Sequence, residues 1–262
     1  MSGTALRIVA LLALGMSACA SNVAHDTATS APLADQPKYA AHATPLTRDH
    51  DYFTRAPAVD FWALAPYYVG QQDDVSCSLA SLTMLVNAAR RGSAPRSEEP
   101  LVSQPRLLER VASDVWTHGL APGGPGVTLE ELAVLARQSL EVYGMKPQRV
   151  EVTHVAEVTP AALERLRDVL RANESSGSDW LLFNFLARTY LGTGEAGDYG
   201  HIAPVGAYDA ERQRVLVLDP DRQWYEPYWL ADDVALAGMA TRDPDSGQPR
   251  GYVYVSLPVP AH

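Results

Sequence analysis

Hydrophobic positions recur with helical spacing along the first half of the chain and gather into short strand-like runs along the second half. Apolar residues three and four positions apart predict amphipathic helices. The helices predicted in this way are 77–91, 104–116, 128–142, 160–173 and 230–238. Runs rich in β-branched and aromatic residues predict strands. The predicted strands are 148–154, 179–186, 202–208, 214–219 and 251–257. Helices followed by adjacent, hairpin-connected strands indicate an α+β fold.

Start signals support three of these helices. Thr128 and Glu131 form a T-x-x-E capping box in front of an apolar stretch. Thr159 followed by Pro160 has the pattern of an N-cap and a first helical residue. Ser76 is the expected N-cap of the helix that begins near Cys77.

The first 50 residues have a different character from the rest of the chain. Residues 1–18 contain an apolar run too short to span a bilayer but typical of a signal peptide. The residues before Cys19 resemble a bacterial lipoprotein box, which implies cleavage there and lipidation of Cys19; ordinary secretory cleavage nearby is the alternative. We expect 19–50 to be a flexible tether and 51–262 to be one catalytic domain. The expected location is the bacterial periplasm, with a lipid anchor in the outer membrane favoured because no Asp follows Cys19.

Composition narrows the functional classes. The chain has 262 residues, 47% of them hydrophobic, and a formal net charge of −10. An acidic chain without a marked Lys/Arg cluster argues against nucleic acid as a partner.

The chain has only two cysteines, Cys19 and Cys77. If Cys19 carries lipid, Cys77 is a free thiol in an oxidising compartment, where most cysteines form disulfides. A thiol at a helix N-terminus is favoured as the nucleophilic thiolate. The alternative is an inert cysteine packed as a small hydrophobic residue.

His201 is the histidine best placed to assist such a thiolate. It opens a predicted hairpin whose turn is centred near residue 210, so that His201 and Asp219 would lie directly opposite each other. An Asp in that place orients and stabilises the imidazole. Asp221 is a weaker choice, and a hairpin cap without catalysis is the alternative. Gln71, six residues before Cys77, could complete an oxyanion hole with the Cys77 N–H.

Five segments occur in a consistent order over residues 51–258: YYVGQQDDVSCSLASLTMLVNA, GVTLEELA, FNFLARTY, GHIAPVGAYDAERQRVLVLDPDRQWYEPYW and RGYVYVSL. They resemble the catalytic domain of phytochelatin synthases. The resemblance implies a papain-like fold and a glutathione γ-glutamylcysteinyltransferase. Such an enzyme attacks the Cys–Gly bond of glutathione, releases glycine and holds γ-Glu-Cys as a thioester.

The resemblance also implies roles for individual residues. Cys77 is the nucleophile, His201 the general base and acid, Asp219 the orienting acid and Gln71 the oxyanion-hole residue. The substrate-binding residues that it implies are Asn184, Gly200, Asp243 and Arg250. Opposite charges at Asp243 and Arg250 suit the α-amino and α-carboxylate groups of a γ-glutamyl head; a plain turn role for Asp243 is the alternative.

The sequence departs from the family pattern at several points. Ser78 stands where Gly is usual, Pro220 where an aliphatic residue is usual, and the segment between Asn184 and His201 is longer. Because no Cys-rich region stands after the resembling segments, the resemblance is to the short prokaryotic members of the family, which implies an enzyme that mainly hydrolyses glutathione. The balance between hydrolysis and transfer to phytochelatins stays open.

We expect no metal ion bound by the protein itself, because cysteines are few and no His pair has i, i+4 spacing. Cadmium and zinc ions are expected as glutathione thiolates, which makes glutathione and its metal thiolates the expected partners. Assembly is left open between a monomer and a homodimer.

Two other functions fit part of the pattern. A papain-like peptidase of the bacteriocin-processing type shares the Gln-to-Cys spacing and the D-P element. A lipoprotein that binds thiols or metal thiolates without catalysis is the other alternative, since an exported Cys77 is open to oxidation.

Overall fold

A seven-stranded sheet with helices on both faces forms the centre of the computed structural model, which describes residues 37–91, 96–192 and 197–258. The strand order is β1-β6-β5-β4-β3-β7-β2, and every neighbouring pair is antiparallel. The predicted α+β class is therefore confirmed, and the arrangement is consistent with the papain-like fold.

The strands are β1 (Ala43–Pro45), β2 (Arg149–His154), β3 (Asp179–Leu186), β4 (Gly200–Asp209), β5 (Arg214–Val217), β6 (Tyr228–Ala231) and β7 (Gly251–Ser256). The helices are α1 (Tyr52–Arg55), α2 (Val59–Leu64), α3 (Cys77–Arg90), α4 (Gln104–Val111), α5 (Asp114–Gly119), α6 (Leu129–Glu141), α7 (Pro160–Glu174), α8 (Ala187–Leu191) and α9 (Asp232–Met239). Short 3-10 turns lie after β1, at Leu46–Arg48, and after α2, at Ala65–Tyr67.

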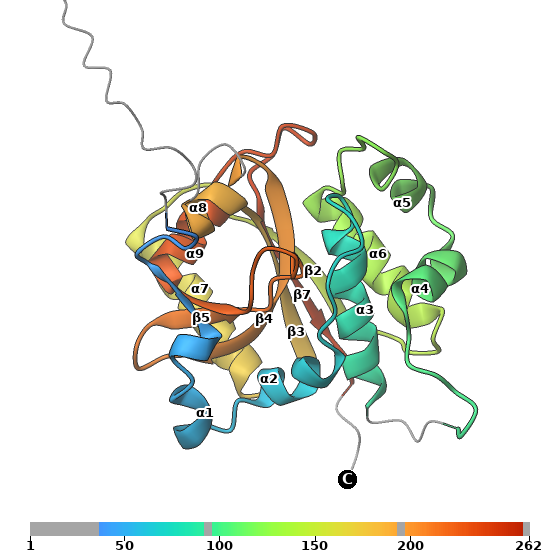
Figure 1. The fold of residues 1–262 in the computed structure, drawn as a ribbon, viewed down its shortest axis with the longest axis horizontal. Helices are drawn as coiled ribbons and strands as arrows, with labels where there is room; N and C mark the ends of the chain where they lie inside the picture. Colours follow the sequence, from blue (N-terminus) through green and yellow to red (C-terminus); the bar gives the residue numbers. More distant parts are fainter. Residues whose placement is uncertain (1–36, 92–95, 193–196, 259–262) are drawn as a thin grey trace, which may run out of the picture. The chain divides into compact units, whose positions relative to one another are not determined.

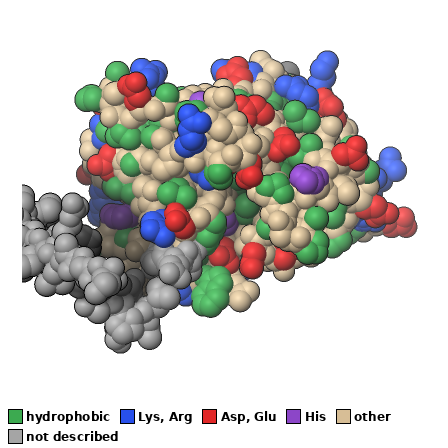
Figure 2. All heavy atoms as spheres, turned by 90° about the horizontal axis from the view of Figure 1, so that it is seen from above, with side chains coloured by type: hydrophobic (Ala, Val, Ile, Leu, Met, Phe, Trp, Pro, Cys, Tyr) green, Lys and Arg blue, Asp and Glu red, His purple; other side chains and the backbone are tan. Residues whose placement is uncertain are grey.

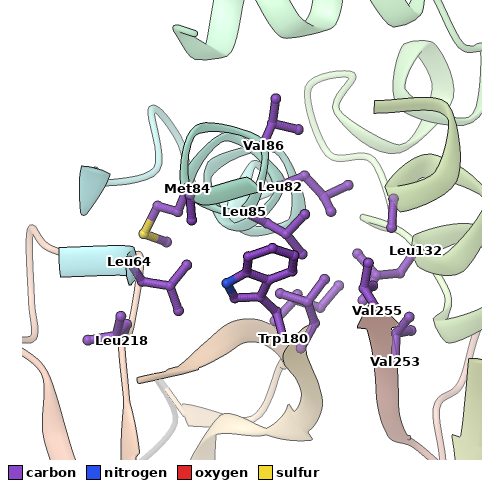
Figure 3. Packing of buried hydrophobic residues seen from close by; sticks show 14 of the residues in the cluster. Leu64, Leu82, Met84, Leu85, Val86, Leu132, Trp180, Leu218, Val253 and Val255 are labelled. Carbon is purple, nitrogen blue, oxygen red and sulfur yellow. The ribbon is translucent and has the colours of Figure 1, made fainter. Parts of the chain in front are cut away.

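Each face of the sheet has its own hydrophobic core. On one face, Leu82 and Leu85 of α3 pack with Trp180 of β3 and Val253 of β7 (Figure 3). On the other face, α7, α8 and α9 cover the sheet (Figure 1). Each fully buried aliphatic side chain contributes about 1.5–3 kcal/mol, so α3 is anchored along its length. The helix that begins at Cys77 is thereby held rigidly against the sheet.

Local capping signals predicted helix starts well. The Thr128–Glu131 capping box is present at α6, and the Thr159 side chain caps α7 with Pro160 in its first turn. The predicted helix 104–116 is wrong, because it is two helices. Ala112, with φ of 45°, ends α4, and the Ser113 side chain caps α5.

The predicted helix at 230–238 also needs correction. It begins at Asp232, because Tyr228–Ala231 is paired as β6 between β5 and β1. The strand was missed since its four residues run directly into the helix without a turn signal.

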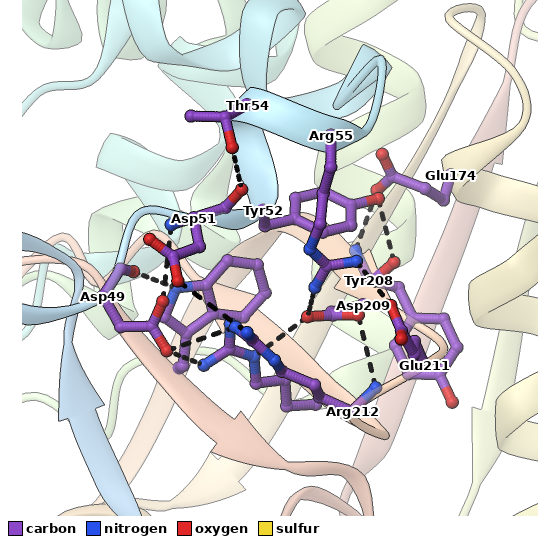
Figure 4. A network of polar contacts seen from close by, with 12 residues as sticks. Asp49, Asp51, Tyr52, Thr54, Arg55, Glu174, Tyr208, Asp209, Glu211 and Arg212 are labelled. Atoms are coloured by element: carbon purple, nitrogen blue, oxygen red, sulfur yellow. Dashed lines mark hydrogen bonds and ion pairs between the residues drawn. The ribbon is translucent and has the colours of Figure 1, made fainter.

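The folded body begins earlier than residue 51. Ala43–Pro45, predicted within the tether, pairs with β6 as an edge strand. Polar contacts fix the following segment: Arg55 donates to Asp209 at 2.5 Å, and the Tyr52 hydroxyl donates to the Tyr208 carbonyl at 3.1 Å (Figure 4). The boundary was misplaced because a three-residue edge strand has almost no periodic signal.

The predicted signal peptide, Cys19 and the tether up to residue 36 lie outside the described residues. Within the described ranges, no helix combines the length and the apolar character that crossing a membrane requires. Figure 2 shows acidic and basic side chains interspersed on the face that it presents.

Candidate active site

Cys77 is the first residue of α3 and lies at a buried position, 9% exposed, as a free thiol. Ser76 is the N-cap residue of α3, as predicted, but its side chain makes no capping hydrogen bond. Its hydroxyl instead accepts from the N–H groups of Gln72 and Asp73 at 3.0 and 3.1 Å. The first-turn amides of α3 therefore have no side-chain cap, which suits them to stabilise a thiolate or an oxyanion.

His201 and Asp219 meet in the interior, on β4 and just after β5. Nε2 of His201 donates to Oδ1 of Asp219 at 2.7 Å, and both residues are buried. The predicted contact is present, but the predicted register is wrong. The turn is centred between residues 211 and 212 rather than near 210, so that Asp209 lies opposite Arg214, and a bulge between Val205 and Ala207 then brings Val205 opposite Val217. Asp219 reaches His201 from the segment beyond the strand, where the side chain is aimed by its own hydrogen bonds.

Three donors converge on the Asp219 carboxylate. Besides His201, the Asp221 N–H donates to Oδ1 at 2.9 Å and the Tyr228 hydroxyl donates to Oδ2 at 3.0 Å. Burial alone would raise the pKa of Asp219, but the charge of His201 and these hydrogen bonds lower it overall. Asp221 thus supports the acid through its backbone rather than replacing it. The role of Tyr228 was not predicted, although it belongs to the WYEPYW run.

The surroundings of the His201 imidazole stabilise its protonated form. Burial would lower its pKa, but the Asp219 carboxylate, their hydrogen bond and the contact with Cys77 raise it well above 6.5. Phe185 and Tyr199 stand edge-on to the ring at 5.5 and 6.0 Å. Since Nε2 is committed to Asp219, Nδ1 is the nitrogen left for Cys77. The arrangement places an imidazole that favours its protonated form beside the Cys77 sulfur, as thiol-based nucleophilic catalysis requires.

A cavity of about 620 Å³ opens beside this group. Its wall includes Cys77, His201, Asn184, Gly200, Asp243 and Arg250. The structure therefore brings six of the predicted site residues to one place. Another hollow, of about 500 Å³, lies among Arg and Glu side chains near the far end of α3 and contains none of them.

Charged and polar groups line one part of the cavity wall. Nη1 of Arg250 lies 3.1 Å from Oδ1 of Asp243, and both residues are buried. Nε of Arg250 and Oδ1 of Asn184 are buried without a hydrogen-bond partner among the described residues. A Cβ on Gly200 would lie 2.9–3.1 Å from the Arg250 guanidinium, so the glycine makes room for it. These groups are ready to bind a small ligand with both charges.

Gln71 and Ser78, which are close to Cys77 in the sequence, make contacts that the sequence did not predict. The backbone N–H of Gln71 donates to the Pro220 carbonyl at 2.7 Å, which ties it to the Asp219 segment. Its Oε1 is buried without a partner in the described part of the chain, and the cavity wall as described does not include it. The oxyanion role of Gln71 stays a prediction. Ser78, the unusual neighbour of Cys77, accepts a hydrogen bond from Trp116 Nε1 at 3.1 Å and so serves packing.

In the ranges that the structure describes, no group of three or more His, Cys, Asp or Glu side chains is arranged to hold a metal ion.

Comparisons with known proteins point to one family. The phytochelatin synthase family model matches residues 47–252. The chain is 29% identical over 203 residues to glutathione gamma-glutamylcysteinyltransferase 3 of Lotus japonicus, which covers 75% of this chain and 37% of that protein. It is 26% identical over 201 residues to glutathione gamma-glutamylcysteinyltransferase of Schizosaccharomyces pombe, covering 74% and 42%. It is 26% identical over 198 residues to glutathione gamma-glutamylcysteinyltransferase 1 of Arabidopsis thaliana, covering 76% and 37%. The match thus spans about two fifths of the length of these relatives.

Proposed function

Because the chain belongs to the phytochelatin synthase family, we propose that it cleaves the Cys–Gly bond of glutathione through a thioester on Cys77. The curated relatives are named for γ-glutamylcysteinyl transfer from glutathione. The proposal assigns the same acyl donor to this chain.

The observation that carries the proposal is the Cys77–His201–Asp219 arrangement beside the cavity. The Cys77 thiolate attacks the cysteinyl carbonyl, and the oxygen of the tetrahedral intermediate is stabilised by the N–H groups at the start of α3. The His201 imidazolium gives its proton to the departing glycine amine. Neutral His201 then takes a proton from the incoming nucleophile, and Cys77 leaves as the thioester breaks.

The charged end of the cavity supports glutathione over a general peptide. The γ-glutamyl head carries an α-amino and an α-carboxylate group, which Asp243 and Arg250 complement. The carboxylate can accept from Arg250 Nε, and the amino group can donate to Asn184 Oδ1, two buried groups that lack partners among the described residues. A bacteriocin-processing peptidase would have no use for this pair.

The second nucleophile is either water, which gives hydrolysis, or another glutathione, which gives a phytochelatin. We propose that metal ions take part as substrate, bound to glutathione thiolates. We also propose that the protein is exported and carries a lipid anchor at Cys19; the support for both is the leader sequence, residues 1–19. Intact mass of the membrane-extracted chain, with a Cys19→Ala variant as control, tests that part.

Product analysis tests the main proposal. The purified full chain should release equal amounts of glycine and of γ-Glu-Cys or its transfer products from glutathione, and the Cys77→Ala variant should release neither. Intact glutathione together with cleavage of peptides after Gly-Gly would instead support the peptidase. A fully reduced chain that binds glutathione without any product would support the binding-protein alternative.

A further inference from the structure

The segment that leads from β3 to His201 is longer than the family pattern has it. It begins with α8, whose first N–H group, from Ala187, donates to the Tyr199 carbonyl at 3.0 Å. This bond continues the pairing of β3 with β4 by one residue beyond Leu186 and Gly200. The backbone of Tyr199 is therefore held at the end of the ladder, two residues before the imidazole of the site.

The residues just before Tyr199 pack closely onto α8. A Cβ on Gly197 would lie 3.0–3.3 Å from the backbone and Cβ atoms of Arg188, so the glycine permits the close approach. Nη2 of Arg188 also lies 3.3 Å from Oδ2 of Asp198, an exposed pair that adds little stability by itself. Residues 197–199 thus lie against α8, which fixes the point from which the Tyr199 side chain leaves the backbone.

The Tyr199 ring covers the imidazole of His201. Residues two apart along a strand face the same side of the sheet, and the two rings meet edge-on with their centroids 6.0 Å apart. Tyr199 also lines the cavity beside Cys77. The other aromatic ring against the imidazole, that of Phe185, is fully buried, whereas Tyr199 is 37% exposed and His201 is 3% exposed. Tyr199 is therefore the outer of the two rings, between the imidazole and the solvent.

The Tyr199 hydroxyl is unsuited to acid–base chemistry. Burial raises the pKa of Tyr199 above its ordinary value, and the neighbouring Tyr225 and the carboxylates of Asp221 and Asp219 raise it further. The phenol is therefore neutral over the working pH range of a thiol enzyme. What this residue offers the site is the apolar surface of its ring.

A thioester on Cys77 is open to two kinds of nucleophile, water and an amine. Both compete for the same carbonyl, and His201 takes a proton from either one. Attack by the amine forms a C–N bond, breaks the C–S bond and frees the Cys77 thiolate beside the imidazolium. Because exclusion of water protects reactive intermediates from hydrolysis, a ring over the imidazole changes the outcome of this competition.

We propose that Tyr199 is a specificity-determining residue whose ring keeps water from His201 and the thioester, and so raises the share of γ-Glu-Cys that is transferred to an amine. The inference rests on the proposed function, because it needs the thioester on Cys77. It goes beyond that function by assigning the choice of the second nucleophile to a residue of the longer segment. The acceptors that it concerns are the α-amino groups of amino acids and small peptides.

Isotopically labelled glycine tests the proposal with the full chain and glutathione. Glycine that attacks the thioester re-forms glutathione carrying the label, whereas water gives γ-Glu-Cys, and mass spectrometry measures both products. The parent should form labelled glutathione. Tyr199→Ala should lower the ratio of labelled glutathione to γ-Glu-Cys about fivefold, a change of about 1 kcal/mol in relative barrier. Since both products arise from one thioester, a variant that is only slow to form it keeps the ratio of the parent.

Two control variants separate the ring from other effects. Tyr199→Phe keeps the ring and loses the hydroxyl, so it should keep the ratio of the parent. Trp224→Ala removes an aromatic side chain that is 56% exposed and does not belong to the cavity wall, and it should keep the ratio as well. An unchanged ratio in Tyr199→Ala, or an equal fall in Trp224→Ala, overturns the inference while glutathione cleavage stands.

Hydrogen–deuterium exchange at the C2 carbon of the His201 imidazole tests the cover without any substrate. Exchange should be slow in the parent and in Tyr199→Phe, and faster in Tyr199→Ala. If the chain cleaves no glutathione, the proposed function fails and this exchange decides on the cover by itself. Equal exchange rates in the parent and Tyr199→Ala overturn the inference whatever the substrate is.

Discussion

Replacing Gly200 by Ala tests the charged end of the cavity without changing a charge. The added Cβ would lie 2.9 Å from Nη2, 3.0 Å from Cζ and 3.1 Å from Nη1 of Arg250. An ordinary contact begins at about 3.4 Å, so the guanidinium must move by roughly half an ångström. Arg250 is 4% exposed and pairs with Asp243 at 3.1 Å, so it has little room to do this without disturbing the pair.

The size of the effect follows from the group displaced. A hydrogen bond to a charged group contributes about 1.5–3 kcal/mol, and about 1.4 kcal/mol corresponds to a factor of ten. Partial misplacement of Arg250 should therefore raise KM for glutathione about tenfold. Neighbouring strand residues point to opposite faces, so the imidazole of His201 should be undisturbed and kcat should change by less than about threefold.

The assay is steady-state glycine release from glutathione, with Arg250→Lys as the matched comparison. Lys keeps the charge but loses the two-pronged geometry of the guanidinium, so it should also raise KM. An unchanged KM in Gly200→Ala would show that Arg250 does not bind the substrate. A fall in kcat alone would show that the substitution acts through His201 and would refute the reasoning.

Two further predictions follow from buried groups. Tyr228→Phe removes one donor from Asp219, so kcat should fall about tenfold or more, and the acid limb of the pH–rate profile should move to higher pH because the pKa of Asp219 rises. The control is Tyr190→Phe, which removes an equally buried hydroxyl bonded to a backbone carbonyl and should leave kcat and the pH–rate profile unchanged. Equal kinetics in the two variants would contradict this prediction. Asp60 is buried with both carboxylate oxygens unpartnered among the described residues, and burial and the charges of nearby carboxylates raise its pKa well above 3.8. Because the pKa of Asp60 is raised in the folded state, the folded protein loses stability as the pH rises through that pKa. Asp60→Asn should therefore raise Tm at pH 8 by roughly 2–4 °C for each kcal/mol of unfolding free energy gained, and the gain should shrink towards pH 4. An equal gain in Tm at both pH values would contradict the prediction.

Sequence reasoning located the parts of the site that depend on local pattern. The start of α3 at Cys77 follows from helical periodicity, and the meeting of His201 with Asp219 follows from a hairpin between two strands. The register was wrong because the turn is centred between residues 211 and 212, which a polar run without a turn signature does not reveal, and the bulge between Val205 and Ala207 then changes the offset by one residue.

The supporting groups could not be read from spacing. Tyr228 reaches Asp219 through β6, a strand too short and too close to α9 to give its own signal. Ser76 occupies the predicted N-cap position of α3, but its hydroxyl accepts from the N–H groups of Gln72 and Asp73 in the preceding turn instead of capping the helix. Such choices between nearby partners are decided by three-dimensional geometry, which a one-dimensional pattern does not contain.

The most direct test of the central claim is the intact mass of the full chain after brief mixing with glutathione and acid quenching. The proposed chemistry predicts an adduct with the mass of one γ-glutamylcysteinyl group on Cys77, appearing together with free glycine and absent in Cys77→Ala. A reduced, folded chain that forms no adduct and releases no glycine would contradict the assignment of Cys77 as the nucleophile that opens glutathione.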